Sequence, residues 1–144
     1  MTTLTPFLLF DGNCAEAMAF YQSVLGGELS LTTLGETAMG NEAPLEQHHK
    51  VAYGHLVNGG IEFSAVDWMH QTRRPNVGNT VAVYLTDANA GELRRIFDGL
   101  SVGADPDLLD DLEVLPFGTY GHLVDRYGVG WFFRGDPDAT PQEP

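Results

Sequence analysis

Tyr53-Gly54-His55-Leu56-Val57 recurs letter for letter in the second half of the chain as Tyr120-Gly121-His122-Leu123-Val124. Five identical residues in both halves of a 144-residue chain indicate an internal duplication. Each copy is followed by a turn and an apolar stretch, at 60–66 in the first half and at 129–133 in the second. The sequence therefore predicts two structural repeats, each of which ends in a hairpin.

The first repeat is expected to contain one helix and four strands. Apolar residues recur at helical spacing from Cys14 to Leu25, and Asn13 stands where a helix N-cap is expected. Gly26-Gly27 is expected to end this helix. The polar segment 35–49 is expected to be a long loop. Apolar or alternating stretches predict strands at 4–10, 28–34, 51–57 and 60–66.

The same order of elements follows a polar link at 67–78. A helix is expected at 88–100, and strands are expected at 80–85, 112–115, 119–124 and 129–133. The predicted fold class is α+β, with two β-α-β-β-β repeats at 4–66 and 79–134. Each repeat would place its helix on one face of a four-stranded sheet, and the two curved sheets would enclose a cup-shaped cavity. The repeats are expected to form a single domain over 1–134, followed by a flexible tail at 135–144.

Charge and composition argue against several classes of function. The chain has 20 acidic and 7 basic residues and a formal net charge of −13, which disfavours a nucleic-acid partner because phosphate binding needs clustered Lys and Arg. Cys14 is the single cysteine, so we expect no disulfide within the chain and a reducing, cytoplasmic location. Neither a signal peptide nor an apolar segment of about 20 residues is present, so no membrane partner is expected.

Two blocks of sequence carry a family resemblance. The first is TPFLLFDGNCAEAMAFY at 5–21, continued by LGGEL at 25–29, and the second is Phe117-Gly118 with DRYGVGW at 125–131. With these blocks the chain resembles the vicinal oxygen chelate superfamily, which includes glyoxalase I, extradiol dioxygenases, and the bleomycin- and fosfomycin-resistance proteins. Within it the chain is most similar to the PhnB-like group, described as 3-demethylubiquinone 3-methyltransferase-like. The resemblance covers about 4–134.

The resemblance implies a glyoxalase-like module that binds a small organic molecule in its cavity. It also implies a homodimer in which paired modules complete their cavities across the subunit interface. Superfamily enzymes hold a divalent metal ion with four ligands, and the matching positions here are Pro6, Glu62, Val81 and Phe132. Among these four, Glu62 alone has a side chain that can bind a metal, so we expect neither a metal site nor another cofactor. The sequence has no Gly-rich nucleotide-binding loop after a predicted strand, so it gives no support to methyl transfer.

The turn at Asn58-Gly59 predicts which side chains share a face of the first sheet. A two-residue loop there would place His55 directly opposite Glu62. Because Glu62 falls on a cavity position of the superfamily, His55 is expected in the cavity too. By the repeat, His122 is expected to occupy the corresponding place, opposite Phe132. The cavity is therefore predicted to contain His55, Glu62 and His122.

Other side chains are assigned to the wall of this cavity or to the opposite, helix-facing side. Leu8, Val81, Val83 and Phe132 are expected to bind the ligand along the wall, and Arg134 is expected to bind it at the mouth. The side chains expected to face the helices instead are Phe7, Leu9, Ile61, Phe63, Tyr84 and Trp131.

Three functions remain open from the sequence. The first is a PhnB-like small-molecule-binding protein without a metal. The second is a metal-independent lyase, isomerase or transferase in which Glu62 acts with His55 or His122 as acid/base. The third is a resistance protein that sequesters a cationic antibiotic, which the acidic charge favours. Whether the protein is an enzyme is left open.

The same residues also have structural interpretations. His55 and Glu62 can form a cross-strand polar pair, and His122 can be a partly buried histidine with its own hydrogen-bond partner. Cys14, in the first turn of a helix, is either a reactive thiol or a small buried filler, and we favour the buried filler.

Overall fold

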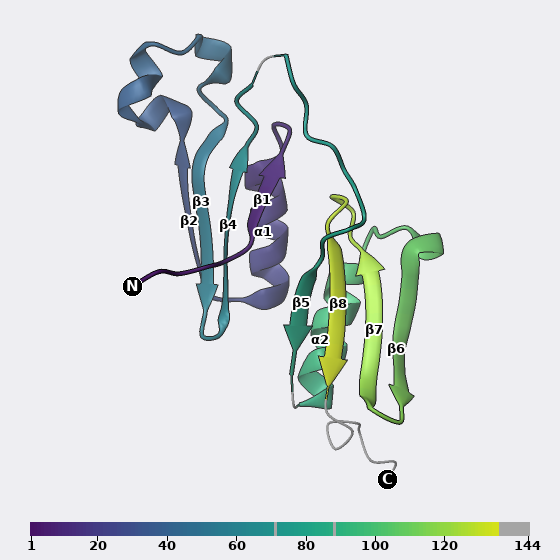
Figure 1. Ribbon diagram of the computed structural model, residues 1–144. Coiled ribbons are helices and arrows are strands. Elements are labelled where there is room, and N and C mark those ends of the chain that lie inside the picture. The colour runs from purple at the N-terminus through teal and green to yellow at the C-terminus, as the bar shows by residue number, and fades with distance from the viewer. Residues whose placement is uncertain (71, 88, 136–144) are drawn as a thin grey trace. The chain divides into compact units, whose positions relative to one another are not determined.

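The computed structural model describes residues 1–70, 72–87 and 89–135. The chain divides into two compact units, Met1–Asn76 and Val77–Pro144. Among the described residues, each unit contains one α-helix and one four-stranded sheet (Figure 1). Among those residues, no helix is both long and apolar enough to cross a membrane.

The first unit has the predicted β-α-β-β-β order. Its elements are β1 (Phe7–Phe10), α1 (Cys14–Leu25), β2 (Glu28–Thr33), β3 (Val51–Asn58) and β4 (Ile61–Asp67). The strand order is β1-β4-β3-β2, with β1 parallel to β4 and the other pairs antiparallel. Both predicted ends of α1 are confirmed. The segment expected to be a loop contains three short 3-10 turns, η1 (Leu34–Glu36), η2 (Ala38–Asn41) and η3 (Leu45–Gln47).

The second unit repeats this topology. Its elements are β5 (Val83–Thr86), α2 (Ala90–Ser101), η4 (Pro106–Leu108), β6 (Leu109–Leu115), β7 (Gly118–Val124) and β8 (Gly130–Gly135). The strand order is β5-β8-β7-β6, with β5 parallel to β8. The predicted α+β fold class and its two repeats are therefore confirmed. The single domain and the cup between the sheets stay predictions. The tail was expected at 135–144, but Gly135 belongs to β8, and 136–144 lie outside the described residues.

The core of each unit lies between its helix and one face of its sheet. In the first unit Tyr21 of α1 meets Phe63 of β4 edge-on, with ring centroids 5.8 Å apart. In the second, Phe97 of α2 meets Phe133 of β8 at 5.0 Å. All four rings are at most 2% exposed. We call the other side of each sheet, which faces away from its own helix, the open face.

The duplicated sequence has the same orientation in both units. Its glycine and leucine are buried against the helix, whereas its tyrosine, histidine and valine point to the open face. A Cβ on Gly121 would lie 2.7 Å from Leu112 Cδ2 and 3.2 Å from Phe97 Cε2. On Gly54 it would lie 3.0 Å from a backbone oxygen of β4. The repeated glycine therefore allows the adjacent strand to lie close in both units. In the second unit it also allows α2 to lie close to the sheet.

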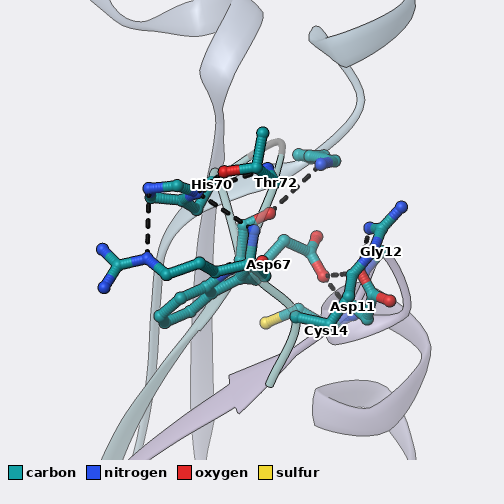
Figure 2. A network of polar contacts seen from close by, with 10 residues as sticks. Asp11, Gly12, Cys14, Asp67, His70 and Thr72 are labelled. Carbon is teal, nitrogen blue, oxygen red and sulfur yellow. Dashed lines mark hydrogen bonds and ion pairs between the residues drawn. The ribbon is translucent and has the colours of Figure 1, made fainter.

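Asp67 joins three segments of the first unit (Figure 2). Its Oδ1 accepts hydrogen bonds from the backbone N–H groups of Gly12 at 2.9 Å and Cys14 at 3.0 Å, and its Oδ2 accepts from Val51 at 2.8 Å. The residue is 1% exposed. The predicted capping role of Asn13 is wrong, because its side chain makes no cap hydrogen bond and Asp67 accepts the first N–H of α1 instead.

The β3–β4 hairpin differs in register from the prediction. The loop is Gly59-Gly60, and His55 lies opposite Ser64 rather than Glu62. Asn58 remains in the ladder, and its side chain donates a hydrogen bond to the backbone oxygen of Leu25 at 2.8 Å. The register is shifted by two residues, which leaves every side chain on the predicted face. His55 and Glu62 therefore share the open face although they are not directly opposed.

Candidate functional site

His55 and Glu62 meet on the open face of the first sheet. His55 Nε2 lies 2.7 Å from Glu62 Oε2. An ionised carboxylate carries no proton, so His55 must be the donor, and Nδ1 of a neutral imidazole is then the acceptor nitrogen. Tyr53, two residues earlier on β3, stacks nearly parallel to the imidazole with ring centroids 6.3 Å apart. Among the described residues, none forms a hydrogen bond with Nδ1.

This pair is accessible to solvent and to a ligand. The His55 side chain is 25% exposed and that of Glu62 is 50% exposed. Exposed ion pairs typically contribute about 1 kcal/mol or less to stability. Glu62 can orient the imidazole so that Nδ1 accepts a proton from a bound molecule. The same geometry also suits a simple cross-strand polar pair, so the chemical role stays a prediction.

The open face beside this pair has a different wall from the one predicted. β1 lies alongside β4 with Phe7 next to Ser64 and Leu8 next to Ala65. Phe7 is therefore on the face of His55 and is 56% exposed, as is Leu9 at 43%. Leu8 was predicted on the cavity wall, and Phe7 and Leu9 were predicted to face the helix. These assignments are wrong, because Phe10 is buried in the core and sets the alternation of β1.

The second sheet places His122 directly opposite Phe132, as the repeat predicts. The two ring centroids are 4.4 Å apart. His122 Nδ1 lies 3.9 Å from Asp110 Oδ2, which is too long for a hydrogen bond. The His122 side chain is 24% exposed, so it is neither buried nor fully solvated.

The predicted positions of Val83 and Tyr84 are exchanged. Val83 lies next to buried Trp131 and faces α2, whereas Tyr84 lies next to Phe132 and is 61% exposed. β1 and β5 thus show the same inversion. Both are edge strands paired in parallel, so no hairpin turn links either strand to its partner and fixes the register.

A cavity of about 590 Å³ lies in the second unit. Its volume is within the range of small-molecule sites. We call it the second-unit cavity. Its lining is largely apolar and includes Val77, Val81, Leu108, His122, Val124 and Phe132. Of the residues predicted to contact a ligand, His122, Val81 and Phe132 therefore line it. A smaller hollow of about 300 Å³ lies in the first unit beside Leu34, Met39 and Met69.

Aromatic rings continue from this cavity along the open face of the second sheet. Tyr120 lies 6.0 Å from Phe132, and Phe117 lies 6.4 Å from Tyr120. We call Phe117, Tyr120 and Phe132 the aromatic row. Arg134 stands over its end, with Cζ 5.0 Å from the Phe117 ring centroid. The sequence prediction missed Tyr120 and Phe117, although Tyr120 has the strand spacing from His122 that puts both on one face.

Cys14 does not have the properties of a reactive thiol. It is completely buried, and burial, with a smaller effect of the Asp67 charge, raises its pKa from 9.0 to about 12. The interpretation as a buried filler is therefore confirmed.

The residues at the superfamily's metal positions do not fit a metal ion. Pro6 uses its carbonyl oxygen to accept the N–H of Ser64, and the carboxylate of Glu62 is bonded to His55. Val81 and Phe132 have no side-chain donor atom. Within 1–70, 72–87 and 89–135, no three His, Cys, Asp or Glu side chains form a group that could hold a metal ion. The absence of a metal in the working protein stays a prediction.

Comparison with known proteins gives one family and one fold. The sequence model of a family described as 3-demethylubiquinone-9 3-methyltransferase matches residues 2–133. The Pseudomonas aeruginosa protein PA1353 is 25% identical with a TM-score of 0.81, over 94% of this chain and 98% of that one. The PhnB protein from Bacillus cereus is 25% identical with a TM-score of 0.70, over 93% of this chain and 99% of that one.

A more distant structure shows the fold alone. The glyoxylase/bleomycin resistance protein/dioxygenase domain from Frankia sp. EAN1pec has a TM-score of 0.64 at 13% identity. The match covers 97% of this chain and 96% of that one. The two modules of this chain therefore have the fold of that superfamily, and its chemistry does not follow from the fold.

Proposed function

We propose that this chain, which belongs to the PhnB-like family described as 3-demethylubiquinone-9 3-methyltransferase, is a protein that binds a small organic molecule without a metal ion. The observation that carries the proposal is the second-unit cavity of about 590 Å³, in which His122 lies against Phe132. A largely apolar lining with a few polar side chains, here Asn79 and His122, is typical of ligand sites. The mismatch at the metal positions supports binding that does not depend on a metal.

A thermal-shift screen of metabolites tests this function, because a ligand that binds the native state alone raises the melting temperature. At least one metabolite is expected to raise it. Phe132→Ala should then reduce the shift, since it removes the ring that lines the cavity. Val102→Ala, at an exposed position after α2, should leave the shift unchanged. Failure of every metabolite, or an unchanged shift in Phe132→Ala, would contradict the proposal.

A second candidate is a metal-independent lyase, isomerase or transferase. The 2.7 Å contact of His55 with Glu62 favours it, because an oriented imidazole with an available Nδ1 can remove a proton from a bound molecule. Once a substrate is known, His55→Gln should abolish turnover and Glu62→Gln should lower it. Full turnover in both variants would reject this role and leave binding alone.

Drug sequestration receives no such support. A cationic drug would need a carboxylate in its site, and none of the described residues that line the second-unit cavity is acidic. We also propose a cytoplasmic homodimer that does not bind nucleic acid, on the basis of family resemblance, the buried Cys14 and the net charge of −13. Light scattering that gives a monomer at working concentration would contradict the dimer.

A further inference from the structure

Arg134 differs in its partners from Arg74, Arg94 and Arg95. Arg74, Arg94 and Arg95 each form an ion pair with a carboxylate. Arg134 is exposed, yet no carboxylate of the described residues forms an ion pair with it, in a chain that has 20 acidic residues. Its guanidinium donates one hydrogen bond to the Phe117 carbonyl at 3.1 Å and lies over the Phe117 ring. As far as the described residues are concerned, most of its donors therefore remain able to bind an anion.

The surroundings of Arg134 are aromatic. Tyr120 is its direct neighbour across the β7–β8 ladder. Tyr120 contacts Phe132, and Phe132 lines the second-unit cavity. A flat molecule that extends from the cavity toward Arg134 would therefore meet aromatic rings along its whole length.

The charges on the open face of the second sheet would orient a molecule that carries a negative group. Asp110 and Glu113 lie on β6, opposite His122 and Tyr120 respectively. β7 separates them from β8, which holds Arg134. A negatively charged group is thus attracted to the β8 side and repelled from the β6 side.

We propose that the aromatic row and Arg134 bind an aromatic carboxylate, with its ring on Tyr120 and Phe132 and its carboxylate on the Arg134 guanidinium. The planar guanidinium can form two parallel hydrogen bonds with a carboxylate, which a lysine could not reproduce. Offset or edge-on ring contacts add to this binding. This inference rests on the proposed function, because it names the ligand class of the same site.

Calorimetric titration with three probes tests the proposal at one fixed ionic strength. 2-Naphthoate has both the ring and the charge, 2-naphthamide has the ring without the charge, and cyclohexanecarboxylate has the charge without an aromatic ring. 2-Naphthoate should bind at least about tenfold more tightly than either of the others. The amide loses the charged hydrogen bond to Arg134, and cyclohexanecarboxylate loses the ring contacts.

Variants separate the two contributions. Arg134→Gln should weaken 2-naphthoate about tenfold or more and leave 2-naphthamide unchanged. Tyr120→Leu should weaken both aromatic probes. Arg95→Gln removes an exposed arginine of α2 and serves as the control that leaves all three affinities unchanged. Circular dichroism and melting temperature show whether each variant is folded.

Several results would overturn the proposal. One is no binding of 2-naphthoate, and another is equal affinity for 2-naphthoate and its amide. An unchanged 2-naphthoate affinity in Arg134→Gln is a third. If Phe117→Ser turned a dimer into a monomer without changing 2-naphthoate affinity, a second copy of the chain would be the occupant of the row. A metabolite that raises the melting temperature while 2-naphthoate fails would reject the ligand class and keep the proposed function.

Discussion

The buried carboxylate of Asp67 connects the start of α1 and the start of β3 to the end of β4. Its carboxylate accepts three backbone N–H groups from two chain segments that are distant from it in sequence. If the carboxylate is removed, these buried N–H groups lose their acceptor. The folded state then bears the full free-energy cost of their desolvation. The sequence shows an aspartate at the end of a strand, which suggests a turn, and gives no sign of which N–H groups it will accept.

Replacing Asp67 should therefore be costly. Asp67→Ala is expected to lower the free energy of unfolding by about 3 kcal/mol or more, measured by urea denaturation. Asp67→Asn should cost less, since the amide keeps one acceptor oxygen. Glu42→Gln, at an exposed carboxylate, is the control for the change of charge. Equal stability of Asp67→Ala and the control would show that water replaces the carboxylate at this junction.

Cys14 makes stability depend on alkaline pH. Burial raises the pKa of its thiol from 9.0 to about 12, so above pH 9.0 the unfolded chain loses a proton that the folded chain keeps. The unfolded state then binds fewer protons, and the stabilisation present below pH 9.0 declines as the pH rises toward 12.

The variant Cys14→Ala should remove this component. Its free energy of unfolding is expected to fall less steeply above pH 9.0 than that of the unmodified protein. Parallel urea titrations at several alkaline pH values measure the two slopes. Identical slopes would mean that the thiol has an ordinary pKa in the folded protein.

The end of α1 packs so closely against the end of β3 that few substitutions fit between these two elements. Gly27 has φ +90°, and a Cβ there would lie 2.3 Å from the Val57 carbonyl oxygen. In the same region Asn58 holds the helix end through the Leu25 carbonyl. This contact keeps Asn58 in the strand and moves the loop to Gly59-Gly60, which a turn rule based on Asn58-Gly59 alone does not foresee.

Gly27→Ala should destabilise the protein by about 1–3 kcal/mol from its backbone conformation alone, with the clash in addition. Gly60→Ala is the matched control, because its φ is not positive and nothing lies within 4 Å of its Cβ position. Thermal denaturation of the two variants measures the difference. A similar melting temperature for both would contradict the close approach of α1 and β3.

The two errors in side-chain facing belong to the same kind of element. β1 and β5 are short edge strands that pair in parallel, so their phase depends on which residue enters the core. Phe10 and Leu85 are the buried ones, and both precede the polar turn to the helix. In contrast, the turns of two hairpins link β3 to β4 and β7 to β8. The side chains predicted on these strands lie on the expected faces, namely His55, Glu62, His122 and Phe132.

At the scale of the whole molecule, the duplication made the fold predictable. One repeat of Tyr-Gly-His-Leu-Val fixed corresponding strands in both halves, and the identical strand orders follow from it. The acidic strand β6 was predicted too short, because Asp110 and Asp111 do not resemble strand residues. They are compatible with an edge strand, where charged side chains are solvated and discourage pairing with other chains.

The site was predictable to a smaller extent. Strand alternation was enough to find His122 and Phe132, since it needs no knowledge of packing. The cavity volume, and the lack of a carboxylate partner for Arg134 among the described residues, depend on where every neighbouring side chain ends, and the sequence does not specify this. The two repeated histidines also have different neighbours, since His55 contacts the Glu62 carboxylate and His122 contacts the Phe132 ring.

The proposed function requires that a small organic molecule binds in the second-unit cavity. Its most direct test is an NMR titration of the protein with the metabolite that most raises its melting temperature, followed through the backbone amide signals. We expect the shifts to concentrate at His122, Val124 and Phe132, which line this cavity. Shifts concentrated instead around Leu34 and Met39, at the smaller hollow of the first unit, would contradict it.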